Sequence, residues 1–105
     1  MDMIKFTDYG QERDLICTEQ EREIFNIISE MADADLRLVR RCDNYVTAVY
    51  DDWDIARIKY TNRAKWIQFP VIDRGSTKHR IESVDDVRSM AEFVENSLSH
   101  IRKYQ

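Results

Sequence analysis

The chain has 105 residues, a formal net charge of −4 and 43% apolar residues, with only two glycines and one proline. This length fits one domain, and the apolar content suffices for one core without a metal ion or disulfides. The low glycine and proline content argues against long disorder and against a turn-rich β-sandwich. We therefore expect a single domain over residues 1–105.

The two cysteines, Cys17 and Cys42, lie far apart, and neither has another cysteine or a histidine at metal-ligand spacing. We expect two buried, reduced thiols in a cytoplasmic protein, with a single disulfide as the alternative. The first residues lack the apolar run of a signal peptide, and no stretch approaches the roughly 18–20 apolar residues of a membrane span.

The charges are unevenly distributed along the chain. Residues 1–35 contain ten acidic and three basic residues, residues 36–81 five acidic and ten basic, and residues 82–105 five acidic and three basic. An acidic and a basic surface on one molecule would steer association with a charged partner. The alternative is that the two regions neutralise each other within the fold or within a dimer.

The N-terminal third predicts an arm followed by a helix. Ile4 and Phe6 alternate with polar residues, so residues 1–17 form an arm or edge strand, with a break at Tyr9-Gly10. Residues 18–21, Thr-Glu-Gln-Glu, have the capping-box pattern. Apolar residues then recur at helical spacing, so we expect a helix that ends near residues 33–35.

The middle of the chain predicts antiparallel strands. Residues 44–50, 53–60 and 63–69 are rich in β-branched and aromatic residues, and residues 36–42 alternate imperfectly. Asp51-Asp52 and Thr61-Asn62 form the connecting turns, and the asparagine of the second can take a left-handed conformation. Links this short join only antiparallel neighbours. Pro70 ends the last strand because proline donates no hydrogen bond to a sheet.

The C-terminal part predicts a polar connection and a second helix. Residues 71–82 contain a turn at 74–76, with Ile72 and Ile81 flanking a short hairpin, and Ser83 caps the helix. The predicted fold is thus a two-layer α+β domain with an N-terminal helix, an antiparallel meander of three or four strands and a C-terminal helix. The apolar residues of this helix form a heptad seam: Val84, Val87, Ala91, Val94, Leu98 and Ile101. The seam favours packing of the helix on the sheet, and a homodimer built through the helix is the alternative.

A search for chemistry finds no catalytic set and no cofactor motif. The only histidines, His79 and His100, lack metal-type ligands at helical spacing, and the two glycines form no phosphate loop. Asp51, Asp52 and Asp54 could bind Mg²⁺ beside a lysine. Because Asp54 and Lys59 are separated by an odd number of residues, we place them on opposite strand faces and interpret the aspartates as a solvated turn. Residues 78–80, Lys-His-Arg, are interpreted as a solvated loop, with phosphate binding as the alternative.

The most distinctive segment is the basic and aromatic block from Trp53 to Pro70. Strict alternation places Trp53, Arg57 and Lys59 on one face of its first strand. Aromatic and cationic residues on an exposed sheet face suit either stacked bases with phosphates or a protein interface. The alternative is that the tryptophans are core residues covered by basic side chains. The predicted partner-binding residues are Trp53, Arg57, Lys59, Arg63, Lys65, Trp66, Asp51, Asp52 and Asp54.

Residues 57–67, RIKYTNRAKWI, preceded by NYVT at 44–47, resemble small uncharacterised proteins of Gram-positive bacteria and of their phages and mobile elements. The resemblance covers about residues 44–70 and implies no activity and no site residue. In size and acidic charge the chain is similar to phage proteins that inhibit host defence by binding a nuclease effector, such as anti-CRISPR proteins. This similarity concerns only size and charge and is not a physical argument for a shared function.

We therefore expect a protein that acts by binding and not by catalysis. The leading hypothesis is an inhibitor or regulator that binds a bacterial protein effector such as a CRISPR–Cas nuclease, with its acidic first segment and last helix in a nucleic-acid groove. The second is a nucleic-acid-binding module that uses the basic and aromatic strands. The third is a metal-dependent nuclease at the three aspartates.

Overall fold

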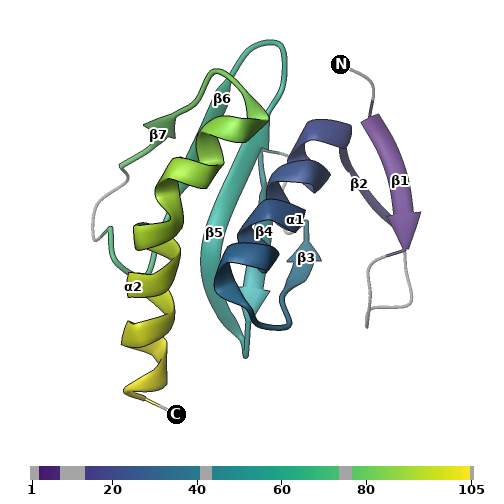
Figure 1. The fold of residues 1–105 in the computed structure, drawn as a ribbon. Helices are drawn as coiled ribbons and strands as arrows, with labels where there is room; N and C mark the ends of the chain where they lie inside the picture. The colour runs from purple at the N-terminus through teal and green to yellow at the C-terminus, as the bar shows by residue number, and fades with distance from the viewer. Residues whose placement is uncertain (1–2, 8–13, 41–43, 74–76, 105) are drawn as a thin grey trace.

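The computed structural model describes residues 3–7, 14–40, 44–73 and 77–104, and its main body has two layers (Figure 1). Helices α1 (Glu19–Ala32) and α2 (Ala91–Arg102) form one layer and lie side by side over one face of a sheet. The predicted α+β class is confirmed. The sheet is antiparallel, and its five strands follow chain order: β3 (Arg37–Val39), β4 (Val46–Tyr50), β5 (Trp53–Tyr60), β6 (Lys65–Gln68) and β7 (His79–Arg80).

The sheet has more strands than the three or four expected because its two edge strands are short. β3 has three residues and β7 has two, so neither shows a periodic pattern in the sequence. The bounds of β5 agree with the predicted 53–60, whereas β4 and β6 are shorter than expected. Neither α1 nor α2, nor any other described helix, is long and apolar enough to cross a bilayer.

The expected N-terminal arm is a separate hairpin. β1 (Met3–Thr7) pairs antiparallel with β2 (Asp14–Thr18), so that Met3 lies opposite Thr18, and the hairpin lies beside α1 (Figure 1). β2 leads directly into α1. The break expected at Tyr9-Gly10 falls outside the described residues.

The predicted capping box starts α1. The Glu21 amide donates to the Thr18 hydroxyl at 3.1 Å, and the Thr18 amide donates to the Glu21 carboxylate at 2.8 Å. These two bonds satisfy amides that a helix start leaves without partners. The helix stops at Asp33, which adopts a left-handed conformation with φ of 50°, close to the predicted end.

The two central turns differ in conformation. Asp51 and Asp52 have φ of 46° and 68°, as a two-residue type I′ hairpin requires, so the predicted turn is confirmed. The connection between β5 and β6 spans four residues and is closed by the Thr61 amide, which donates to the Ala64 carbonyl at 2.9 Å. Asn62 does not use the left-handed conformation that asparagine can take, because a four-residue connection turns without it.

A β-bulge interrupts β5 at Ile55. Ala48 lies opposite Ala56 whereas Val49 lies opposite Asp54, so Ile55 is an extra residue without a partner. Ile55 and Ala56 are both buried in the core, and the bulge shifts the alternation of every preceding residue. The prediction that Asp54 and Lys59 lie on opposite faces was therefore wrong.

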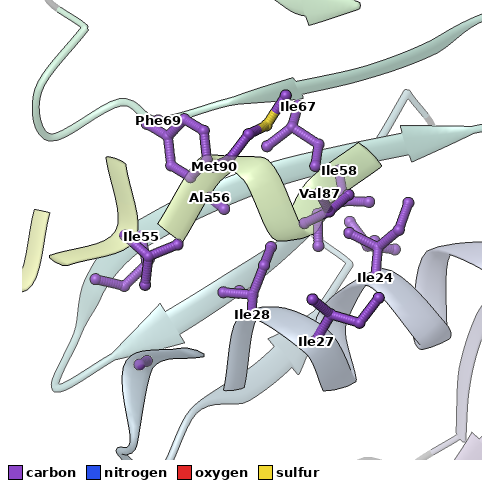
Figure 2. Close-up of a cluster of buried hydrophobic side chains, with 14 of the residues drawn as sticks. Ile24, Ile27, Ile28, Ile55, Ala56, Ile58, Ile67, Phe69, Val87 and Met90 are labelled. Carbon is purple, nitrogen blue, oxygen red and sulfur yellow. The ribbon is translucent and has the colours of Figure 1, made fainter. Parts of the chain in front are cut away.

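The core lies between the helices and the sheet. Figure 2 shows isoleucines of α1, such as Ile24 and Ile28, pointing toward Ile58 and Ile67 of the sheet, and all four are fully buried. Burying such a side chain contributes about 1.5–3 kcal/mol. Cys17 is also fully buried and carries a free thiol, as predicted, while Cys42 lies outside the described residues.

The last helical region begins with a 3₁₀ helix, η1 (Val84–Met90), which Ser83 precedes, and α2 follows it directly. Ser83 therefore begins η1 and not an α-helix as expected. The heptad seam faces the core, because Val87, Val94, Leu98 and Ile101 are buried there. This confirms that the helix packs on the sheet, and the same burial removes the seam as a dimer contact.

Candidate functional site

The second face of the sheet carries the candidate site. No helix among the described residues covers this face, which we call the open face (Figure 1). Cross-strand pairing places Arg57 beside Gln68 and Lys59 beside Trp66, all on the open face. Ile58 and Ile67, one residue away on each strand, point into the core. The register thus brings two of the predicted cations and one predicted tryptophan together.

A chain of cations and aromatic rings crosses the open face. The Lys78 ammonium lies 4.7 Å from the centre of the Trp66 ring, and the Arg57 guanidinium lies 5.4 Å from the centre of the Tyr45 ring. The two rings meet edge to face with centroids 5.9 Å apart. Each cation–π contact contributes about 0.5–1 kcal/mol at an exposed site, so the rings hold the cations in place.

Neutral hydrogen-bond acceptors hold two of these cations further. Arg57 Nη1 donates to the side-chain oxygen of Gln68 at 3.1 Å, and Lys59 Nζ donates to the backbone carbonyl of Asn44 at 2.9 Å. Neither acceptor has a negative charge. Both cations therefore keep their charge available for an external anion.

These side chains surround a depression of about 520 Å³. This size lies in the range of ligand pockets, about 300–1,000 Å³. Its described lining contains three cations and no carboxylate, and Arg80, opposite Trp66 in the β6–β7 pairing, adds a fourth cation to the same face. The lining residues are Asn44, Tyr45, Arg57, Lys59, Trp66, Gln68 and Lys78.

Two buried polar atoms on the open face, one of them within a cation of the depression, have no hydrogen-bond partner among the described residues. They are Nε of Arg57 and Oγ1 of Thr47, which lie on opposed residues of β5 and β4. Thr47 is only 1% exposed. A buried polar group without a partner costs about 1–3 kcal/mol, and functional sites are one place where proteins retain such groups.

The charged regions of the sequence lie on different layers of the molecule. The open face carries the four cations named above, whereas exposed acidic residues lie on α1, η1 and α2: Glu19, Glu23, Glu30, Asp85, Glu92 and Glu95. Local ion pairs, such as Glu30 with Arg88 at 3.9 Å, neutralise only part of the acidic layer. The open face is therefore cationic and the helix layer largely acidic, while Arg40 pairs with Glu21 at 3.6 Å and neutralises one charge of each region within the fold.

The structure separates the other predicted site residues from this depression. Lys65 lies on the helix side, where its ammonium is 5.0 Å from the Tyr60 ring, and Arg63 is exposed in the β5–β6 connection. Trp53 lies at the opposite end of β5 and stacks on Tyr104. Asp51 and Asp52 form the β4–β5 turn, where Asp52 pairs with Arg37 at 3.6 Å, and Asp54 lies in β5 opposite Val49.

Four residues of the depression were not among the predicted partner-binding residues: Asn44, Tyr45, Gln68 and Lys78. Tyr45 and Gln68 lie on the open face through strand register, which a single sequence does not show. Lys78 belongs to the segment 78–80 that was interpreted as a solvated loop; that interpretation was wrong for His79 and Arg80, which form β7.

Nucleophilic and metal chemistry find no support in the described residues. Burial raises the pKa of the Cys17 thiol to about 11, and the nearby Glu21 carboxylate adds to the increase, so the thiol stays protonated and unreactive. His79 is 2.9 Å from the Asp73 carboxylate. No three histidine, cysteine or acidic side chains in the described part of the chain are grouped so that they could hold a metal ion.

A scan against protein-family models and searches among curated proteins and solved structures found no match for this chain.

Proposed function

We propose that the protein is a non-enzymatic binding protein that holds an acidic segment of a partner protein in the depression on the open face. The observation that supports this is the set of three cations, Arg57, Lys59 and Lys78, around a depression whose described lining has no carboxylate. Rings and carbonyl groups fix these cations before a partner arrives, which lowers the ordering cost of binding. Tyrosine, tryptophan and arginine are also the residues most frequent at interface hot spots.

The exposure of the rings favours a protein partner over a nucleic acid. Single-stranded nucleic acids bind largely by stacking bases on exposed rings. Trp66 is only 9% exposed, and its ring contacts Lys78 and Tyr45. The open face thus offers charge but little free ring surface. Binding through phosphates alone is the alternative, and the acidic helix layer opposes it because it adds repulsion.

A chemical-shift titration tests this proposal and its alternative together. The ¹⁵N-labelled protein is titrated with a hexaglutamate peptide and, separately, with a ten-residue oligothymidine at equal low salt. We expect hexaglutamate to shift the signals of Lys59, Lys78 and the Trp66 indole, with an affinity that falls as salt is added. Tighter binding of the oligothymidine at the same residues would favour a nucleic acid as the partner over a protein. Unchanged signals with both probes would refute a binding site at this depression.

Small size and acidic charge, in which the chain is similar to phage proteins that inhibit host defence, support a more specific partner. We propose a bacterial protein effector, such as a CRISPR–Cas nuclease, that the protein inhibits or regulates. The acidic layer of α1 and α2 supports a second contact, because it matches the positive charge of a nucleic-acid groove.

Capture from a bacterial lysate with matched variants tests this second step. The wild-type protein and a Lys65→Glu/Lys103→Glu control should retain one protein that a Lys59→Glu/Lys78→Glu variant loses. The control changes the net charge equally but away from the depression. Retention of the same protein by all three would place the contact elsewhere.

A further inference from the structure

A second depression, of about 420 Å³, lies at the end of the sheet where β5 begins. It shares no described lining residue with the cationic depression, and its lining combines acidic with apolar residues. Asp52 and Asp54 supply the carboxylates, and Trp53, Pro70 and Val71 supply the apolar surface. Trp53 and Tyr104 are the large hydrophobic residues that remain exposed among the described residues, at 37% and 68%.

These two exposed rings stack on each other. Their centroids are 6.1 Å apart with an interplanar angle of 28°, and His100 lies against both, with centroids 6.5 Å from Trp53 and 5.2 Å from Tyr104. Stacking on Tyr104 restricts the rotamers of the Trp53 indole, and the ring still remains exposed at the surface. An aromatic cluster that is fixed yet exposed is typical of a contact surface.

Trp53 differs from three other rings of the protein because no lysine or arginine of the described residues lies over it. The rings of Tyr45, Tyr60 and Trp66 each carry a lysine or arginine of the same chain at 4.7–5.4 Å. Indole binds cations more strongly than the other aromatic side chains. The Asp52 carboxylate, which lies 3.6 Å from Arg37 but is 95% exposed, and the adjacent Asp54 carboxylate raise the local attraction for positive charge.

We propose that this second depression binds an arginine side chain of a partner protein. The flat guanidinium would stack on the Trp53 indole while its N–H groups donate to the carboxylates of Asp52 or Asp54. Pro70 and Val71 would contact the methylene groups of the arginine. Arginine fits better than lysine because only a planar fork can stack and hydrogen-bond at once. This inference stands on its own lining residues and does not depend on the cationic depression.

Blocked tripeptides test the proposal by ¹⁵N NMR of the full chain. Gly-Arg-Gly should shift the Trp53 indole N–H signal along a saturable curve, whereas Gly-Gln-Gly at the same ionic strength should not. The Trp66 indole signal should stay in place in both titrations. The Trp53→Leu variant identifies the signal by its loss, and its remaining spectrum reports whether the fold is intact.

Matched charge variants separate this site from general attraction to an acidic protein. Asp52→Asn/Asp54→Asn should weaken Gly-Arg-Gly binding about tenfold, the effect of losing roughly 1.4 kcal/mol. Glu19→Gln/Glu23→Gln removes the same charge from α1 and should leave the affinity within about twofold. Equal shifts with both peptides, or an equal loss in the two double variants, would overturn the proposal.

Discussion

The Glu21 carboxylate accepts a hydrogen bond from the backbone amide of Tyr60 at 3.0 Å, across 39 positions of the sequence. Its other oxygen accepts the Thr18 amide, and the Thr18 hydroxyl donates to the Tyr60 carbonyl at 2.8 Å. The pairing of β4 with β5 begins at Val46 and Ile58, so Tyr60 extends past that ladder. The capping box of α1 thus serves as the strand partner of Tyr60 and fixes the helix to the end of β5.

Glu21→Ala should destabilise the protein strongly. The substitution leaves the buried amides of Thr18 and Tyr60 without acceptors, and each such loss costs about 1–3 kcal/mol. We expect the free energy of unfolding in urea to fall by about 2–4 kcal/mol. Glu23→Ala, on the exposed side of the same helix, should change it by less than about 0.5 kcal/mol. Equal stability of the two variants would contradict this role of Glu21.

The same substitution at two buried threonines should have opposite effects. Thr47→Val removes a hydroxyl that has no partner among the described residues, so the free energy of unfolding should stay equal or rise by up to about 1 kcal/mol. Thr18→Val removes a hydroxyl that both donates and accepts a hydrogen bond, so the free energy of unfolding should fall by about 1–3 kcal/mol. Thermal unfolding of both variants under identical conditions measures the contrast, and a loss of stability in Thr47→Val would show that its hydroxyl has a partner.

The buried thiol predicts a pH dependence at high pH. Burial raises the pKa of Cys17 from its ordinary value of 9.0 to about 11, so the unfolded chain loses this proton first. The stability that depends on the protonated thiol is complete below pH 9 and is lost as the pH rises through 11. In a Cys42→Ser background, the stability difference between Cys17 and Cys17→Ala should shrink over this interval. A constant difference would contradict the raised pKa.

The lowered pKa of Asp86 predicts that stability falls with decreasing pH, the opposite direction to the effect of Cys17. Hydrogen bonds from the backbone amides of Glu82 and Ser83, at 2.8 and 3.0 Å, lower the pKa of Asp86 below its ordinary 3.8. Its contribution is therefore present above pH 3.8 and is lost as the pH falls through the lower folded value. The stability difference between the wild type and Asp86→Asn should be constant near neutral pH and decrease in strong acid. A difference that grows on acidification would reverse the assigned sign.

Local sequence signals predicted much of the fold because they act within a few residues. The capping box at Thr18 and Glu21, the bounds of β5 and the turn at Asp51-Asp52 all follow from short patterns. The bulge at Ile55 follows from cross-strand register, which adjacent residues do not encode. It moved Trp53 away from the face of Arg57, so the predicted tryptophans line two different depressions.

The composition of the cationic depression could be predicted only in part for the same reason. Arg57, Lys59 and Trp66 belong to one recognisable block, but Lys78 reaches them through a two-residue strand. A strand this short has no alternation to detect. Its position follows from pairing with β6, where His79 lies opposite Ile67.

The most direct test of the central claim is a calorimetric comparison of hexaglutamate binding to two charge-reversed variants. Lys59→Glu/Lys78→Glu reverses two cations of the depression, and Lys65→Glu/Lys103→Glu reverses two cations that do not line it. We predict that the first variant weakens the affinity at least about tenfold, while the second weakens it less than about threefold through net charge alone. Equal weakening in both variants would contradict a binding site on the open face.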